Sequence, residues 1–259
     1  MLKFISMLIA TILLSTFAGC VTTGGYTTEP DYVAKVLDRT TFHTHESGES
    51  FDYFGGNANQ FLEVADRSFP VVINVHGCGG VGGYVFKLGV LDNELGMHVV
   101  IPDFLKRAGV SGSCGGTPST VTREVRSYGR INARRHEVDY LVRWLQKNSF
   151  KSIFVYGHSE GGRTVQGIKE RVNGVVISGM DCDAVGFWEP NAQNPLLVLH
   201  SSRDIWLVHW RPIVSCKSLL DRHSAFGEQF VSNGHTHRPT PLWDNEAKTV
   251  FIDFITRFR

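Results

Sequence analysis

A serine with a glycine two residues before it and another two residues after it is the clearest candidate for chemistry in this chain. The stretch Gly157-His158-Ser159-Glu160-Gly161 follows a short apolar run, 152–156, and precedes a helix-like segment, 162–171. In a strand–turn–helix setting the turn is so tight that side chains at the glycine positions would collide with the strand and the helix. The serine hydroxyl is then exposed above the sheet, at the positive end of the helix. The pattern predicts that Ser159 is a nucleophile.

A serine nucleophile needs a carboxylate that orients its base and stabilises the imidazolium formed during the reaction. Asp204 follows the apolar run 196–200, and we predict that it is this acid. Asp181 and Asp183, which follow the preceding apolar run, are the alternatives. An acid after the later strand is the usual arrangement where the order along the chain is Ser, Asp, His.

A histidine must serve as the general base that takes the proton of the serine. Two candidates follow the run 228–231, in the stretch Ser232-Asn233-Gly234-His235-Thr236-His237. We predict that His235, directly after Gly234, is the base, and His237 is the alternative.

A glycine-bearing loop follows the apolar run 71–75 and reads His76-Gly77-Cys78-Gly79-Gly80. Such a loop can turn a backbone N–H group into a pocket. We predict an oxyanion hole made by the N–H groups of Cys78 and Glu160, each donor being worth about 10²–10³ in rate. His76 is expected to be structural and to hold the loop by a hydrogen bond.

Three further side chains are predicted to contact a substrate: Tyr84, Arg107 and His158. Arg107 could meet a carboxylate of the substrate or form a structural ion pair with Asp103. His158 is expected to form a wall of the pocket. Specificity is expected to come from the loops Tyr84–Leu91, Gly109–Thr120 and Gly186–Asn194.

A second reading of the histidines is a metal site. His235-Thr236-His237 and His43-Thr44-His45 each place two imidazoles on one side of an extended chain. No carboxylate stands at a recognisable ligand spacing, and the serine chemistry already uses one of these histidines. We therefore expect no metal and no cofactor.

The elements that must position these residues form a repeating pattern. Short, continuously apolar runs alternate with helical stretches, which is typical of a mostly parallel α/β sheet with helices on both faces. Ligand sites of such sheets lie beyond the carboxyl ends of the strands, where all the candidate residues fall. Edge strands could be added by Val33–Asp38 and Phe51–Phe54. The predicted strands are 71–75, 98–101, 152–156, 174–178, 196–200 and 228–231, and the predicted amphipathic helices are 130–148 and 245–258.

These motifs resemble those of the α/β-hydrolase superfamily, and within it the dienelactone-hydrolase-like group. The resemblance spans roughly residues 70–258. It implies a Ser or Cys nucleophile, a His base, an Asp acid and no cofactor. Ser159 stands where true dienelactone hydrolases carry cysteine, which directs the expected substrate toward ordinary carboxyl esters or other acyl compounds. The resemblance rests on His76–Gly80, Ile101-Pro102-Asp103-Phe104, Arg107, Cys114, Gly157–Gly162, Asp204 and Gly234-His235.

The first residues predict export and lipidation. Lys3 precedes an apolar stretch, 4–14, that is too short to span a bilayer, so residues 1–19 are predicted to be a signal peptide. Phe17-Ala18-Gly19-Cys20 resembles a bacterial lipobox, in which Cys20 becomes the lipidated first residue. We expect residues 20–30 to be a tether, residues 31–259 to be one α/β-hydrolase domain, and the protein to be an outer-membrane lipoprotein facing the periplasm.

Export also affects how the cysteines are interpreted. Without Cys20, the chain has Cys78, Cys114, Cys182 and Cys216, which allow two disulfides in an oxidising compartment, with three possible connectivities. Cys78–Cys114 and Cys182–Cys216 are preferred, because each pair joins loops expected at the same edge of the sheet.

The charged residues are scattered, and the formal net charge is +1. We therefore expect no nucleic-acid partner, and a membrane contact only through the N-terminal lipid. The sequence predicts a serine hydrolase of a carboxyl ester or related acyl bond. An acyltransferase, a serine peptidase and a non-catalytic binding lipoprotein are the alternatives, and no oligomeric state is predicted.

Overall fold

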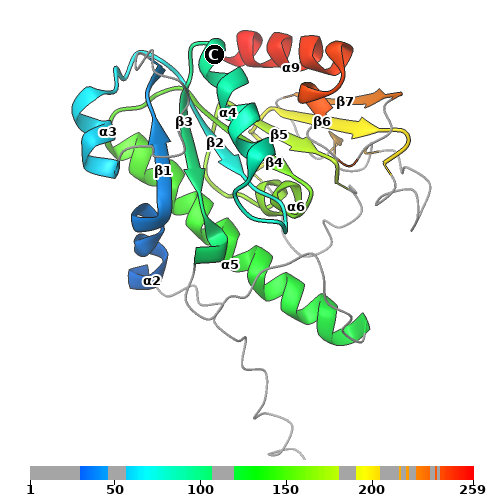
Figure 1. The fold of residues 1–259 in the computed structure, drawn as a ribbon, viewed down its shortest axis with the longest axis horizontal. Helices are drawn as coiled ribbons and strands as arrows, with labels where there is room; N and C mark the ends of the chain where they lie inside the picture. Colours follow the sequence, from blue (N-terminus) through cyan, green and yellow to red (C-terminus); the bar gives the residue numbers. More distant parts are fainter. Residues whose placement is uncertain are drawn as a thin grey trace, which may run out of the picture.

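A computed structural model describes residues 30–45, 57–106, 120–180, 191–204, 216, 220–221, 226–233, 237 and 240–259. Within them, a seven-stranded sheet runs in the order β1-β3-β2-β4-β5-β6-β7 (Figure 1). Only β1 is antiparallel to its neighbour, and the other strands are parallel. The strands are β1 (Thr40–His43), β2 (Val71–Val75), β3 (His98–Pro102), β4 (Ile153–His158), β5 (Gly174–Ser178), β6 (Leu196–Ser201) and β7 (Gly227–Ser232).

The six strands predicted from apolar runs are confirmed: β2 and β5 have the predicted bounds, and the ends of the others differ by at most two residues. Four of them, β2, β3, β5 and β6, are buried at every position, as expected for strands that helices cover on both faces. The fold class predicted from the sequence is therefore confirmed.

The predicted edge strand Val33–Asp38 is wrong. These residues lie in helix α2 (Pro30–Ala34) and the 3-10 helix η1 (Lys35–Arg39), and the edge strand is β1 instead. Val33 and Val36 are both buried, and their spacing of three residues matches a helical face rather than a strand. The other candidate, Phe51–Phe54, lies outside the described residues.

Two apolar layers enclose the sheet, each built from alternate side chains of the strands. One joins the sheet to α3 (Ala58–Val64), α5 (Thr120–Lys147) and α6 (Glu160–Gln166). The other joins it to α4 (Gly83–Glu94) and α9 (Asn245–Phe258). The short 3-10 helices η3 (Phe104–Lys106) and η5 (Thr240–Leu242) lie in the connections.

The predicted helix at 245–258 is confirmed as α9, and the helix at 130–148 is confirmed within the longer α5. The helix after the serine is shorter than predicted, because α6 ends at Gln166. Buried polar side chains of α5 fix it to its surroundings. Glu137 pairs with Arg39 of η1 at 2.6 Å, and Asp139 accepts hydrogen bonds from the N–H groups of Lys169 and Glu170.

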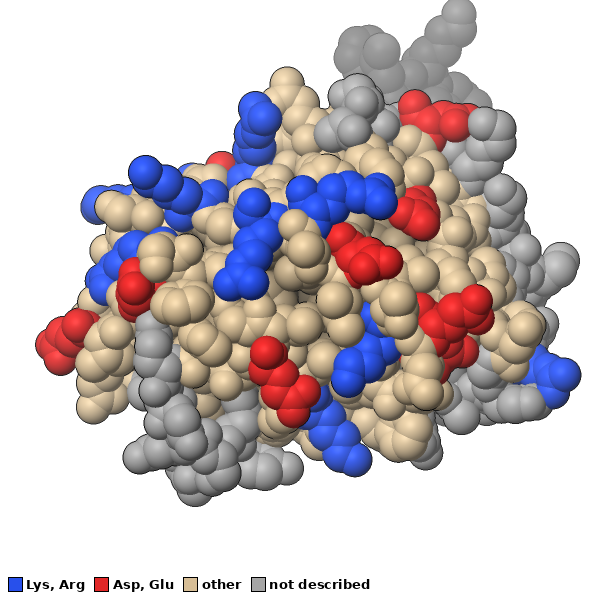
Figure 2. Space-filling model, turned by 90° about the horizontal axis from the view of Figure 1, so that it is seen from above, with Lys and Arg blue, Asp and Glu red and all other residues tan. Residues whose placement is uncertain are grey.

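Basic and acidic side chains are interspersed on the face of the molecule that Figure 2 shows, in keeping with the small net charge. Among the helices that the structure describes, none combines the length and the apolar character needed to cross a bilayer.

Candidate active site

Ser159 sits on a strained turn between β4 and α6. Its φ is 55° and its ψ is −121°, a conformation that residues other than glycine rarely adopt. A Cβ atom at Gly157 would lie 2.3 Å from the carbonyl oxygen of Gly161, and one at Gly161 would lie 2.2 Å from that of Val75. The two glycines are therefore required by the close approach of backbone, as the sequence predicts.

The side chains of Ser159, His237 and Asp204 form a continuous hydrogen-bonded chain. His237 Nε2 lies 2.9 Å from Ser159 Oγ, and His237 Nδ1 lies 2.7 Å from Asp204 Oδ2. Asp204 is buried, and the imidazole of His237 is mostly buried. The three residues follow β4, β6 and β7, so the carboxyl ends of parallel strands bring together positions that are far apart in sequence.

The choice of His235 as the base is corrected, because His237 occupies the place between Ser159 and Asp204. His235 itself lies outside the described residues. Ser159 follows β4, three strand spacings or about 14 Å from β7, so the base must stand where the chain beyond Ser232 brings its ring across to the serine.

No local feature of the sequence separates the two histidines, since both would lie on one side of an extended chain. The choice of Asp204 as the acid agrees with its contact to His237. The alternatives Asp181 and Asp183 lie outside the described residues.

The loop after β2 lies directly against the serine. A Cβ atom at Gly77 would be 3.3 Å from Ser159 Cβ and 3.8 Å from its Oγ. Cys78 follows and lines the same cavity as Ser159. The predicted donors, the N–H groups of Cys78 and Glu160, therefore flank the serine from two different elements. Their role as an oxyanion hole stays a prediction.

His76 holds this loop from inside the protein. Its Nε2 accepts a hydrogen bond from the N–H of Phe104 at 3.0 Å, so Nδ1 carries the proton and donates it to the carbonyl of Gly77 at 2.6 Å. Burial, and then the charge of Arg134, lowers the pKa of His76 to about 3. The neutral ring is thus a structural support, as predicted.

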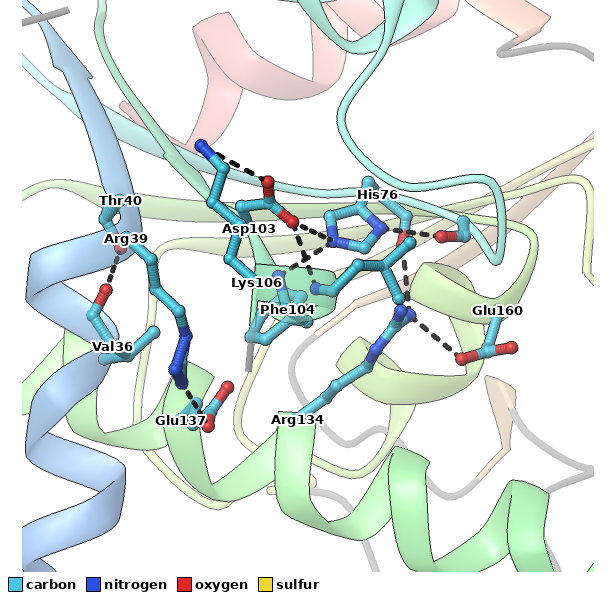
Figure 3. A network of polar contacts seen from close by, with 12 residues as sticks. Val36, Arg39, Thr40, His76, Asp103, Phe104, Lys106, Arg134, Glu137 and Glu160 are labelled. Carbon is cyan, nitrogen blue, oxygen red and sulfur yellow. Dashed lines mark hydrogen bonds and ion pairs between the residues drawn. The ribbon is translucent and has the colours of Figure 1, made fainter. Parts of the chain in front are cut away.

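The side chain of Glu160, next to the serine, is held by two arginines of α5. Arg134 Nη1 lies 3.0 Å from Glu160 Oε1, and Arg130 pairs with Oε2. Arg134 also donates to the carbonyl of His76 at 3.3 Å (Figure 3). The sequence analysis missed these arginines, because nothing in the pattern of α5 marks a buried guanidinium.

A cavity of about 310 Å³ opens beside Ser159, between the sheet and α4. Tyr84, Val85 and Leu88 of α4 form one wall, and the Gly77–Gly80 loop forms another. The structure thus places Tyr84 in the pocket as predicted, but the stretch Tyr84–Leu91 is helical and not a loop. None of the described lining residues is Lys, Arg, Asp or Glu.

His158 also lines this cavity, as predicted. Its ring lies 5.0 Å from that of His237, and Nδ1 lies 3.4 Å from Ser178 Oγ. Burial, and then the neighbouring His237, lowers the pKa of His158 to about 3, so its imidazole is neutral near pH 7. His158 is therefore a neutral wall of the cavity beside His237.

Buried polar groups lie at the base of the cavity, and the sequence analysis did not anticipate them. Asn74 of β2 and Tyr156 of β4 line the cavity and are almost fully buried. Asn74 Nδ2 donates to Asp92 Oδ2 of α4 at 2.8 Å. Burial raises the pKa of Asp92 to about 8, so the carboxyl group is largely protonated at neutral pH.

Some of the predicted residues belong to parts of the chain that the structure does not describe. Arg107, Cys114, Cys182 and Cys20 lie outside the described residues, as do the loops 109–119 and 186–190. Asp103 has Lys106 Nζ 3.7 Å from its carboxylate. Cys78 lies at the cavity and Cys216 lies in the core beside β6. Because their preferred partners, Cys114 and Cys182, lie outside the described residues, the disulfide pairing stays a prediction.

The structure does not bring the two His-x-His stretches together. His43 pairs with Val99 near the start of β3, at the edge of the sheet opposite to the carboxyl ends where His237 lies. His45 Nδ1 lies 3.2 Å from the carbonyl of Asn93. Within the part of the chain that the structure describes, no three His, Cys, Asp or Glu side chains form a group suited to a metal ion.

Comparison with known proteins gives no match to a family model and no match to a curated protein sequence. Solved structures do resemble the chain. TT1662 from Thermus thermophilus has a TM-score of 0.52 at 19% identity, over 73% of this chain and 89% of that chain. Est1E from Butyrivibrio proteoclasticus, solved with ferulic acid, has a TM-score of 0.53 at 12% identity, over 85% of this chain and 94% of its own.

A candidate dienelactone hydrolase from Klebsiella pneumoniae has a TM-score of 0.51 at 14% identity, over 73% of this chain and 88% of that chain. These identities are low, so the likeness concerns the fold. Together with the mostly parallel seven-stranded sheet, it shows that the chain has the α/β-hydrolase fold, in the form shared with dienelactone-hydrolase-like proteins and esterases.

Proposed function

We propose that the protein is a serine hydrolase that cleaves a carboxyl ester or a related acyl bond. The observation that carries this proposal is the hydrogen-bonded chain Ser159–His237–Asp204, with Ser159 on a strained turn at the edge of a cavity. A catalytic serine needs this combination of base, orienting acid and exposed hydroxyl.

In the proposed reaction, His237 Nε2 takes the proton of Ser159 Oγ as the oxygen attacks the ester carbonyl. Asp204 holds the ring and stabilises the imidazolium. The N–H groups of Cys78 and Glu160 bind the oxyanion. His237 then gives its proton to the leaving alcohol, an acyl-enzyme forms, and water attacks it by the same route in reverse.

The lining of the cavity favours a substrate whose acyl group is neutral and partly apolar. Its α4 wall is apolar apart from the Tyr84 hydroxyl, and no charged residue is among the described residues that line it. The structural neighbours named as esterases, such as PE8, agree with this substrate class. Serine in place of cysteine makes an ordinary ester a better candidate than a dienelactone.

The test is labelling with a fluorophosphonate probe, beside turnover of p-nitrophenyl acetate and butyrate. We expect the wild-type protein to be labelled and to hydrolyse both esters, and a folded Ser159→Ala variant to do neither. Labelling that persists in Ser159→Ala would remove the serine from its role. A folded wild-type protein with no labelling would favour a binding protein that keeps the fold without the chemistry.

We further propose that the protein is a lipoprotein, anchored through Cys20 at the outer membrane and facing the periplasm. The support is the apolar stretch 4–14 followed by Phe17-Ala18-Gly19-Cys20. Mass spectrometry of the mature N-terminus should find a lipidated cysteine, and Cys20→Ser should release the protein from the membrane fraction. An unmodified N-terminus in membrane-fraction material would contradict the proposal.

A further inference from the structure

Arg134 links the two sides of the candidate oxyanion hole. Its guanidinium is almost fully buried, although arginine is rarely buried to this degree unless it is paired. On one side it contacts Glu160 Oε1 at 3.0 Å, and on the other it donates to the His76 carbonyl at 3.3 Å. Figure 3 shows the side chain reaching from α5 between these two groups.

The first contact concerns the turn between β4 and α6 that carries Ser159. Glu160 directly follows Ser159, and its backbone N–H is one of the two predicted donors. Because its carboxylate is held by Arg134 and Arg130, the residue cannot turn without breaking two ion pairs that are largely shielded from water. The side chain thus fixes the orientation of its own peptide group.

The second contact concerns the loop after β2. Arg134 holds the carbonyl of His76, and the ring of His76 holds the carbonyl of Gly77. In a trans peptide the C=O and the following N–H point in opposite directions. With the Gly77 carbonyl turned toward the His76 ring, the N–H of Cys78 points away from that ring, and Cys78 lines the cavity.

Phe104 contacts both Arg134 and His76. Its ring lies 5.2 Å from Arg134 Cζ, and its N–H donates to His76 Nε2. The guanidinium is therefore confined by an aromatic face as well as by its polar partners. Both polar contacts come from one nitrogen, Nη1. A lysine could keep the charge, but its ammonium lacks the planar guanidinium that lies over the Phe104 ring and directs Nη1 toward both acceptors.

We propose that Arg134 is a positioning residue that sets the oxyanion hole by holding Glu160 and the His76–Gly77 loop in one fixed geometry. The inference rests on the proposed hydrolase function. Arg134 belongs to α5 and is not among the described residues that line the cavity. In this proposal it orients both backbone donors.

Arg134→Lys tests this assignment. With p-nitrophenyl butyrate we expect kcat to fall about 10- to 100-fold while KM stays within about threefold, because a misaligned donor weakens binding of the transition state and not of the ester. The matched control is Arg143→Lys in the same helix. Arg143 pairs with Glu170 in an exposed site, and its replacement should change kcat by less than twofold.

A second readout separates positioning from general loss of structure. A trifluoromethyl ketone forms a tetrahedral adduct with the serine and needs the oxyanion donors, whereas the matching methyl ketone binds without forming the oxyanion. Arg134→Lys should weaken the binding of the trifluoromethyl ketone by the same factor by which kcat falls. It should leave the binding of the methyl ketone unchanged. If both ketones weaken equally, or if kcat is unchanged, the assignment is overturned.

Glu160→Gln supplies the same test if Arg134→Lys does not fold, since it keeps the backbone N–H and removes the ion pairs. Its kcat should then fall with KM nearly unchanged, and the trifluoromethyl ketone should bind more weakly while the methyl ketone does not. Where Arg134→Lys does fold, the kcat losses of the two variants should not add in the double variant, because the two side chains act as one unit. Additive losses would overturn the proposal. A wild-type protein that neither binds the fluorophosphonate nor turns over ester would instead reject the hydrolase function itself.

Discussion

At the scale of single residues, the proposed mechanism depends on which histidine contacts Ser159. His237 bridges Ser159 Oγ and Asp204 Oδ2, while the neutral His158 and His76 have pKa values lowered to about 3. Among the histidines that the structure describes, His237 is the one that contacts the serine hydroxyl.

His237→Ala should therefore lower kcat for p-nitrophenyl butyrate by about 10³-fold or more, because the serine loses its general base. His235→Ala is the matched control, two residues earlier in the same loop, and should keep kcat within about threefold. Steady-state kinetics of both purified variants checks this. A larger loss in His235→Ala would show that the other histidine is the base.

At the scale of the elements, the turn between β4 and α6 depends on backbone packing. A methyl group on Gly161 would lie 2.2 Å from the carbonyl oxygen of Val75, in the neighbouring strand β2. Nothing comparable surrounds Gly83, the first residue of α4, where an added Cβ would meet no atom within 4 Å.

Gly161→Ala should lower the free energy of unfolding by about 3 kcal/mol or more, because strand and helix must separate to admit the methyl group. Gly83→Ala should leave it unchanged or raise it by up to about 1 kcal/mol, as expected for alanine in a helix. Urea unfolding followed by tryptophan fluorescence measures both. If Gly161→Ala and Gly83→Ala were equally stable, the serine turn would be able to shift and admit the methyl group, which would contradict this prediction.

The contact between β2 and α4 contains a carboxyl group whose protonation affects stability. Asp92 is fully buried, receives a hydrogen bond from Asn74, and has Tyr156 as a neighbouring titratable group. Its pKa is raised from 3.8 to about 8 in the folded protein. Between these values the unfolded chain releases a proton that the folded protein keeps, so the stability contributed by Asp92 falls as pH rises.

Asp92→Asn removes this titration. Relative to the wild-type protein, its free energy of unfolding should rise by about 3 kcal/mol between pH 5.5 and pH 7.5. Urea unfolding at both pH values is the measurement. The exposed Asp253→Asn in α9 serves as the control and should follow the wild-type pH dependence. Parallel curves for Asp92→Asn and wild type would contradict a raised pKa at Asp92.

At the scale of the whole molecule, the predicted disulfides depend on the predicted export, because disulfides persist in an oxidising compartment. If the chain reaches the periplasm, Cys78–Cys114 and Cys182–Cys216 should be oxidised, and peptide mapping without reductant should recover these two pairs. Cys114→Ser should then cost about 2–4 kcal/mol of stability. Four free thiols in periplasmic material, or another pairing, would contradict this prediction.

Much of the architecture was predictable from the chain alone. Short apolar runs marked the six parallel strands, four of which bury every side chain because helices cover both of their faces. The strained serine turn was also predictable, because glycines stand two residues before and two residues after a serine that lies between an apolar run and a helical stretch. The contact that requires Gly161, however, comes from Val75 in the neighbouring strand β2. Asp204 followed from its place after a strand.

Other features depend on how distant segments meet. The sequence alone determined the strand pattern, the serine turn and the edge of the sheet that carries the site, because these depend on local periodicity and on short-range steric contacts. Only the tertiary structure decided for His237 over His235, put β1 in place of a strand at 33–38, and joined Arg134 to Glu160 and His76. The contacts of His237 and Arg134 depend on the lateral distance between strands and on the packing of α5 against the serine turn, which no local pattern encodes. The helix at 33–38 did have a local signal, the spacing of Val33 and Val36, but pairing of β1 with β3 decided which segment forms the edge strand.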